Sequence, residues 1–252
     1  MDDDDLPDAI PAATLILMRP AAAGGPPEIL MLERAETMAF AAGALVFPGG
    51  RIDPGDLELA TRFPGLADAA ARIAAVRETI EETGVAPALR PAPDSAALRA
   101  AMASGRPFGA LLDEMGLTLD LQALTPFARW CPNFREARRF DTLFYLAEAP
   151  PGGGTVHSAD ETESVHTFWA SAATVIAEIE AGRAKAIFPT RRNLERLARF
   201  GSLEEARADA ERHPVRQITP WVEQRGEQRF VCIPEGIGYP VTAEPYDTAR
   251  RR

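Results

Sequence analysis

The sequence predicts an α+β protein in which helices pack on a mixed β-sheet. Segments typical of strands and of helices alternate irregularly along the chain, which favours a mixed rather than a purely parallel sheet. Hydrophobic residues make up 46% of the chain and charged residues 25%, as is usual for folded soluble proteins. The 252 residues are enough for one large domain, or for a domain with a sizeable extension.

The first predicted strands form a hairpin. "AATLILMR" (12–19) is an apolar run, and "ILMLERA" (29–35) is a second one. The Gly- and Pro-rich segment between them is typical of a turn. "ALVFPGGRID" (44–53) then predicts a short strand that runs into a Pro-Gly-Gly turn.

The strongest helix signal lies in "LADAAARIAAVRETIEET" (66–83). Ala69, Ile73, Val76 and Ile80 recur at spacings of four, three and four, which places them on one face of a helix. Gly84 follows as the expected C-terminal cap.

The rest of the chain predicts further helices and strands in the same mixed pattern. Residues 94–124 read as helical and irregular, and a late hairpin is expected around Arg225-Gly226. The remaining predicted elements are strands over 127–132, 139–149 and 163–171 and helices over 172–182 and 189–201.

We expect three parts along the chain. Residues 1–9 are acidic and predict a disordered tail, residues 10–200 a single domain with a helical insertion at about 94–124, and residues 201–252 an extension packed on that domain. The acidic start differs from a basic, apolar signal peptide, so a cytoplasmic protein is expected.

Composition excludes several classes of partner. The formal net charge is -10 and the arginines are scattered, so nucleic acid would be repelled at long range. The chain has no apolar run of membrane-spanning length, so no membrane partner is expected. Cys131 and Cys232 are too few for a disulfide framework or a zinc site.

Three carboxylates lie close together in "RETIEETG" (77–84). Glu78, Glu81 and Glu82 are at i, i+3 and i+4 and project from one side of the predicted helix, roughly opposite its apolar stripe. One interpretation is a solvated acidic face, partly neutralised by Arg77. The other is a site for Mg²⁺ or Mn²⁺, because carboxylates and the carbonyls of the "FPGG" turn are oxygen ligands of the kind these ions prefer.

These residues resemble the Nudix hydrolase superfamily, whose motif is G-x5-E-x7-R-E-U-x-E-E-x-G-U with U a bulky apolar residue. Gly50 opens the motif and "RETIEETGV" (77–85) closes it. Asp56 stands in place of the first glutamate and Thr79 in place of an aliphatic residue. Twenty-six residues separate Gly50 from Arg77, twice the number in the pattern, so the extra length is expected to loop out. The resemblance implies a Nudix fold, an α-β-α sandwich with a mixed central sheet.

The resemblance also implies roles for these residues. Glu78 and Glu82 would bind Mg²⁺ or Mn²⁺ directly, Glu81 would complete the cluster, and the Gly49 carbonyl would add a backbone ligand. Arg77 would orient the glutamates, and Gly50 would lie against the substrate. The reaction implied is hydrolysis of a diphosphate bond in a nucleoside diphosphate linked to a second group X.

A general base is expected on a later loop, "SADETESVHTFW", where Glu161 and Glu163 are the candidates. The alternative is that both are ordinary solvated acids.

Several stretches are similar to the peroxisomal acyl-CoA diphosphatases and their bacterial relatives, among them "RRFDTLFYLAEA" and "FPTRRNLERL". This similarity implies coenzyme A or acyl-CoA as the substrate, with Phe40 against the base and Arg138 and Arg139 against phosphate. Core packing and surface charge are the alternatives for these three residues. ADP-ribose, a dinucleotide or a nucleotide sugar are alternative substrates, and a non-catalytic metabolite-binding protein is an alternative function. The expected partner is a small-molecule nucleotide diphosphate, and homodimer formation stays open.

Overall fold

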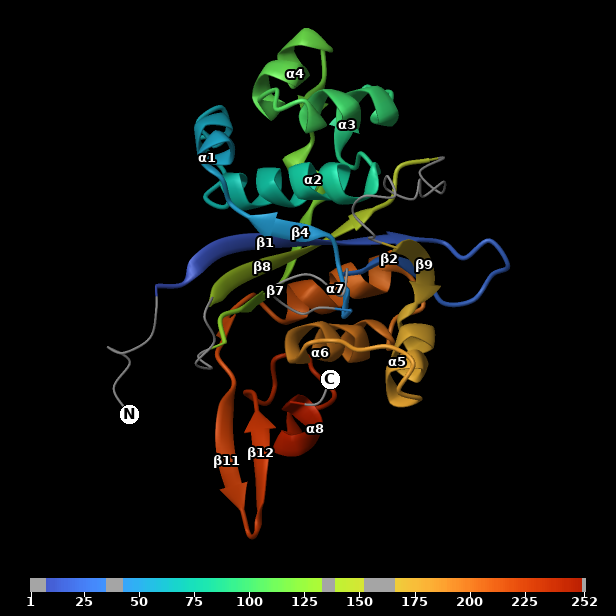
Figure 1. Cartoon of the computed structure of the whole chain (residues 1–252), viewed down its shortest axis with the longest axis vertical. Helices are drawn as coiled ribbons and strands as arrows, with labels where there is room; N and C mark the ends of the chain where they lie inside the picture. The colour runs from blue at the N-terminus through green and yellow to red at the C-terminus, as the bar shows by residue number, and fades with distance from the viewer. Residues whose placement is uncertain (1–7, 35–42, 133–138, 152–165, 251–252) are drawn as a thin grey trace.

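The computed structural model describes residues 8–34, 43–132, 139–151 and 166–250, and centres on an eight-stranded mixed sheet (Figure 1). The strands follow the order β10-β7-β8-β1-β2-β3, with β4 paired to β1 and β9 paired to β2. The predicted mixed sheet is therefore confirmed. Its strands are β1 (Ile10–Arg19), β2 (Glu28–Glu33), β3 (Leu45–Val46), β4 (Gly49–Arg51), β7 (Thr125–Trp130), β8 (Phe140–Glu148), β9 (His166–Ser171) and β10 (Gln217–Ile218).

The two longest strands form the middle of the sheet. β1 pairs with β8 in parallel from Ile10↔Phe140 to Met18↔Glu148. β1 also pairs with β2 in antiparallel fashion at Met18↔Ile29, which confirms the predicted hairpin. At the other end of β1, β4 takes over as its neighbour, with Gly49 opposite Thr14. β1 and β2 therefore separate, and the Pro-Gly-Gly segment lies between them.

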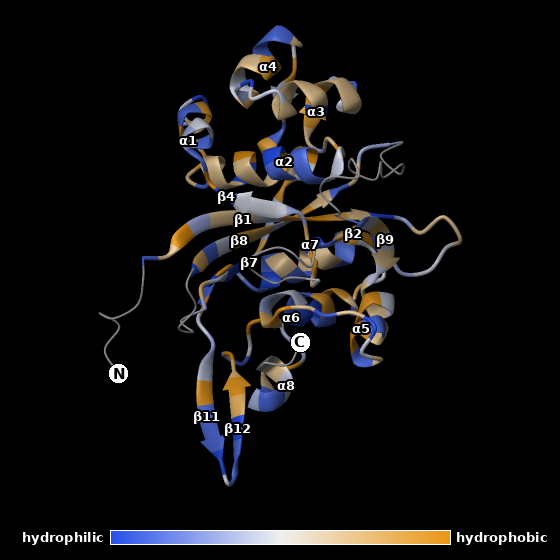
Figure 2. Cartoon of the chain, in the orientation of Figure 1, coloured by the Kyte–Doolittle hydropathy of each residue, from blue (hydrophilic) through white to orange (hydrophobic). Residues whose placement is uncertain are grey.

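Helices cover both faces of the sheet, as Figure 1 shows. On one side lie α1 (Pro54–Ala60), α2 (Ala69–Thr83), α3 (Ser95–Ala103) and α4 (Phe108–Glu114), and on the other α5 (Ala172–Glu180), α6 (Phe188–Leu197) and α7 (Leu203–Arg212). Each side has its own cluster of buried apolar side chains. Apolar residues dominate β1 and β8, which are sandwiched between these clusters (Figure 2). This two-sided burial explains the nearly continuous apolar runs in these strands.

Helix α2 confirms the strongest helix prediction. Ala69, Ile73, Val76 and Ile80 are all buried, and the helix ends at Gly84 with φ +71° and its N–H bonded to the Ile80 carbonyl. The buried surface of α2 is wider than this stripe. Thr79 and Thr83, which lie beside the stripe on the helix, are also buried, and α3 of the helical insertion packs against α2.

The extra length within the motif, expected to loop out, forms a short helix followed by turns over residues 61–68. α1 (Pro54–Ala60) begins with a capping box between Asp53 and Asp56, and it packs against α2. The segment 94–124 contains the helices α3 and α4, the strand β6 (Thr118–Leu119) and the 3-10 turn η2 (Leu121–Ala123). β6 pairs with β5 (Leu89–Arg90), which lies just before this segment.

The last fifty residues belong partly to the main sheet. α7 was not anticipated, although Ser202 caps its N-terminus and its apolar residues are buried. The predicted hairpin is confirmed as β11 (Trp221–Arg225) and β12 (Gln228–Cys232), followed by β13 (Ala243–Pro245) and α8 (Tyr246–Arg250). In the described part of the chain, no helix is both long enough and apolar enough to span a bilayer.

Candidate functional site

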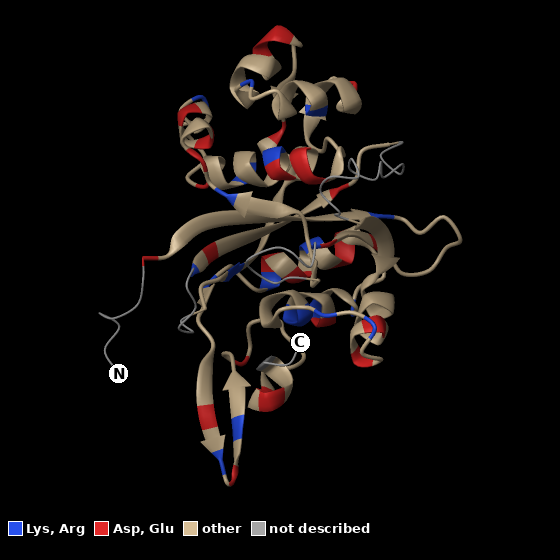
Figure 3. Ribbon diagram, in the orientation of Figure 1, with Lys and Arg blue, Asp and Glu red and all other residues tan. Residues whose placement is uncertain are grey.

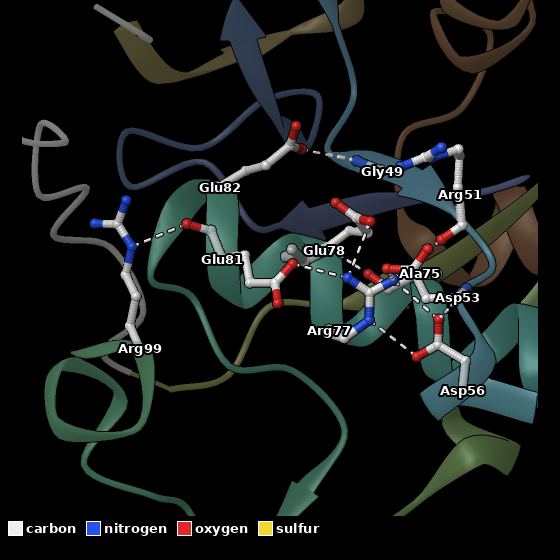
Figure 4. A network of polar contacts seen from close by, with 11 residues as sticks. Gly49, Arg51, Asp53, Asp56, Ala75, Arg77, Glu78, Glu81, Glu82 and Arg99 are labelled. Atoms are coloured by element: carbon white, nitrogen blue, oxygen red, sulfur yellow. Dashed lines mark hydrogen bonds and ion pairs between the residues drawn. The ribbon is translucent and has the colours of Figure 1, made fainter. Parts of the chain in front are cut away.

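The acidic end of α2 meets the glycine strand β4. The Gly49 N–H donates a hydrogen bond of 2.9 Å to Glu82 Oε2 (Figure 4). Gly50 lies directly against Glu78, because a Cβ at residue 50 would lie within 2.6 Å of all three carboxyl atoms of that side chain. A Cβ at Gly49 would lie 2.7 Å from the Cα of Thr14 on β1. Gly50 is therefore required for the close approach of β4 to α2, and Gly49 for the close approach of β4 to β1.

Arg77 links the carboxylates to one another (Figure 4). Its guanidinium donates two bonds of 2.9 Å to Asp56, one of 3.0 Å to Glu78 and one of 2.8 Å to Glu81. It also donates to the carbonyl of Arg51 at 3.0 Å. Burial opposes the positive charge, yet the surrounding carboxylates raise the pKa of Arg77 above its ordinary value. Figure 3 shows basic and acidic segments next to each other along α2.

Asp56 on α1 is the buried acidic partner of Arg77. Its carboxylate forms the two-pronged contact with Arg77 and also accepts from the Asp53 N–H at 2.8 Å. Only 2% of Asp56 is exposed, so the Arg77 charge is the compensation that allows this carboxylate to be buried. Asp56 stands where the motif has glutamate, and this aspartate still provides an acidic partner for Arg77.

The three glutamates carry more negative charge than Arg77 neutralises. Burial raises the pKa of Glu78 and of Glu81, against the lowering effect of the Arg77 charge. Burial raises the pKa of Glu82 to about 8, although the hydrogen bond from Gly49 favours its ionised form. A bound cation would remove this cost, because it would favour the ionised carboxylates.

The donor chemistry of the site suits a hard divalent cation. Glu78 and Glu82 supply carboxylate oxygens to one cavity, and such ligands are those that Mg²⁺ and Mn²⁺ prefer. Glu81 is turned toward Arg77. Within the described ranges no three acidic, histidine or cysteine side chains converge tightly enough to enclose a metal ion. Mg²⁺ commonly binds through one or two carboxylates and keeps several water molecules, so the two pocket-facing glutamates fit this ion.

A cavity of about 790 Å³ extends from these glutamates across the sheet. Its walls come from β1, β3, β4 and β8, from the end of β7 and from the start of α6. The side chains that line it include the aromatic residues Phe47, Trp130, Phe140 and Phe144 and the arginines Arg34, Arg51 and Arg139. The cavity therefore offers apolar surface and positive charge next to the carboxylates.

The structure brings together some of the predicted site residues. Gly49, Gly50, Glu78, Glu82 and Arg139 all line the cavity. The contact observed for Gly49 is made by its N–H, whereas the sequence led us to expect its carbonyl to face the carboxylates.

Four further candidates lie outside the described residues, namely Phe40, Arg138, Glu161 and Glu163. Sequence reasoning missed Arg34, Arg51 and Trp130, which also line the cavity. Arg51 directly follows Gly49 and Gly50, and this position next to the predicted site could have identified it as a cavity residue.

Comparisons with known proteins agree with this geometry. No protein-family model matches the chain. A segment of 57 residues is 46% identical to the putative nudix hydrolase 7 of Caenorhabditis elegans, covering 23% of this chain and only 17% of that protein. A NUDIX hydrolase from Alicyclobacillus acidocaldarius has a similar structure with TM-score 0.69 and 29% sequence identity, covering 80% of this chain and 96% of the other. The MutT protein from Methanosarcina mazei Go1 is more distant, with TM-score 0.45 and 16% identity over 77% of this chain and 96% of that one.

The chain has the Nudix fold, as the neighbour from Alicyclobacillus acidocaldarius shows over most of both chains. Similarity in sequence and in structure to Nudix hydrolases supports an enzyme of the hydrolase class.

Proposed function

We propose that this member of the Nudix hydrolase superfamily hydrolyses a diphosphate bond in a nucleoside diphosphate linked to a second group, with Mg²⁺ or Mn²⁺ bound at Glu78 and Glu82. The observation that supports this most is the contact between the glycine strand and the acidic helix end, with Gly49 bonded to Glu82 and Gly50 packed on Glu78. Two partly buried carboxylates thereby line a cavity of ligand size.

Each residue of the cluster has a distinct role in this proposal. Glu78 and Glu82 hold the cation, and Arg77 fixes the position of Glu78 through a bond of 3.0 Å. Glu81 shares the Arg77 charge and completes the acidic cluster. A bound divalent cation supplies the positive charge that polarises the diphosphate and lowers the pKa of an attacking water molecule.

The general base is proposed to come from the segment that contains Glu161 and Glu163. A carboxylate within hydrogen-bond reach of the attacking water is required to accept its proton. Glu161→Gln and Glu163→Gln test the two residues separately. The variant that loses turnover while keeping substrate affinity identifies the base, and normal turnover in both variants contradicts the assignment.

Coenzyme A or an acyl-CoA is the substrate that we propose first. Besides the diphosphate, this molecule carries an adenine ring and a further phosphate, and the cavity offers aromatic side chains together with Arg34, Arg51 and Arg139. These arginines give the cavity a positive side in a protein of net charge -10. ADP-ribose, a dinucleotide or a nucleotide sugar would use the same chemistry with fewer phosphate contacts.

A panel assay distinguishes these possibilities. Purified protein is incubated with Mg²⁺ or Mn²⁺ and each candidate substrate, and the products are identified by mass spectrometry. Adenosine bisphosphate together with a phosphopantetheine identifies coenzyme A, whereas a nucleoside monophosphate, such as AMP from ADP-ribose, identifies the other substrates. Turnover that persists in excess EDTA contradicts the cation-dependent mechanism. Tight binding without turnover under all conditions would instead indicate a metabolite-binding protein.

A further inference from the structure

The C-terminal extension holds one wall of the cavity through its backbone. β10 pairs in parallel with β7, with Ile218 opposite Trp130. The Cys131 N–H donates to the Ile218 carbonyl at 2.9 Å. The strand that carries Trp130 into the cavity wall is therefore flanked on one side by the extension and on the other by β8.

The extension also contacts the Trp130 side chain. The indole Nε1–H donates a bond of 3.0 Å to the hydroxyl of Tyr239, which donates a bond of 2.7 Å to Asn193 Oδ1 on α6. A tyrosine hydroxyl has one proton, and indole is only a donor, so the direction of both bonds is determined. The Trp130 and Tyr239 rings meet edge to face at 5.6 Å, and all three residues are buried.

The backbone beside Tyr239 is itself tightly placed. Gly238 has φ +94°, and a Cβ there would lie 2.9 Å from Arg196 Nε. Arg199 donates to the Gly238 carbonyl at 3.1 Å, while Arg196 pairs with Asp209 at 2.8 Å. A side chain at residue 238 would disturb this arrangement, so glycine is required. Tyr239 is thereby supported from α6 and α7.

The hydroxyl of Tyr239 connects two walls of the same cavity. Trp130 belongs to the β7 wall, and Thr190 and its neighbours at the start of α6 form the adjacent wall. Asn193 follows on that helix by one turn. The carboxylate cluster has other partners, since Glu78 is bonded to Arg77 and Glu82 to Gly49.

We propose that Tyr239 is a positioning residue that shapes the substrate-binding wall through Trp130 and Asn193. The inference rests on the proposed function in one respect, because it takes the cavity as the substrate site. Loss of the Tyr239 hydroxyl loosens the wall that contacts the organic part of the substrate, while the cation-binding carboxylates keep their partners. The last fifty residues thus support the binding site without lining the cavity at Tyr239, because this residue holds the Trp130 side chain from the protein interior.

The test is Tyr239→Phe, which keeps the ring and removes only the hydroxyl. The change removes the hydrogen bonds to both Trp130 and Asn193. We expect KM for the hydrolysed substrate to rise about five-fold, because the wall is loosened while no direct contact with the substrate is lost, and kcat to change little. Val222→Ala is the matched control, because Val222 lies exposed on β11 of the same extension. The control is expected to leave both constants unchanged. An unaltered KM in Tyr239→Phe overturns the proposal.

Fluorescence provides a second readout that does not depend on activity. In a Trp169→Phe/Trp221→Phe background, Trp130 is the single tryptophan of the chain. Adding Tyr239→Phe is expected to shift its emission to longer wavelength and to increase its quenching by acrylamide. An unchanged spectrum overturns the positioning role. If the wild type hydrolyses no diphosphate, the proposed function fails, and the fluorescence result still decides whether Tyr239 holds Trp130.

Discussion

Replacing Glu82 by glutamine is expected to make the metal-free protein more stable while abolishing the proposed hydrolase activity. Glutamine has the size of glutamate, and its carbonyl oxygen can accept the hydrogen bond from Gly49. It carries no charge, so the cost of burying the ionised carboxylate is removed. The same change removes a proposed ligand of the cation, so turnover is lost.

The magnitude follows from the pKa of Glu82, which burial raises from 4.5 to about 8. The Glu82 carboxyl holds its proton more tightly in the folded protein than in the unfolded chain. The free energy of unfolding of the wild type therefore falls as the pH rises from 4.5 to 8. The advantage of the glutamine variant should therefore grow, from about 1 kcal/mol at pH 5 to about 3 at pH 7 and about 5 at pH 9. Above pH 8 the stability difference between variant and wild type levels off, because Glu82 is then ionised in both the folded and the unfolded states.

Urea denaturation in EDTA at these three pH values measures the difference. Glu227→Gln, an exposed residue of the β11–β12 turn, is the control and should match the wild type throughout. Mg²⁺ should stabilise the wild type and leave the Glu82→Gln variant unaffected. A stability difference that does not increase with pH, or a variant less stable than the wild type at pH 9, would refute the reasoning.

Three further predictions concern the same site. Gly50→Ala places a methyl group against the Glu78 carboxyl, so activity should fall about a hundredfold in steady-state assays; Gly55→Ala, where a Cβ meets nothing within 4 Å, should be unaffected. Asp56→Asn breaks the buried pair with Arg77 and should cost about 3 kcal/mol in urea denaturation, and a loss near zero would show that the pair contributes little. Dialysis against EDTA should abolish turnover and Mn²⁺ should restore it, whereas full activity of the dialysed protein would contradict the role of the cation.

Local signals account for the elements that were predicted well. The four-residue apolar stripe and Gly84 were enough to define the body and end of α2, and the Arg225-Gly226 pair was enough for the late hairpin. α1 was missed because the segment that forms it is short, with no repeated apolar stripe. Its stabilising contacts include the Asp56–Arg77 pair, which joins residues twenty-one positions apart.

The candidate site was predictable to the extent that it lies on one helix. Glu78, Glu81 and Glu82 must share a face at their spacing, whatever the rest of the chain does. Their partial burial does not follow from spacing, because it depends on β4, where Gly49 and Gly50 contact Glu82 and Glu78. Arg34 lies just beyond the end of β2 and reaches the cavity only because β1 and β2 separate around β4.

The amino-acid sequence alone determined the alternation of strands and helices, the order of the motif residues and the acidic face of α2, since these depend on neighbours a few positions apart. The tertiary structure decided which carboxylates lose solvent, that Gly49 and Gly50 receive them, and that Tyr239 reaches Trp130 from more than a hundred residues away. Such contacts depend on sheet register and on packing between layers, and neither is encoded in any single segment.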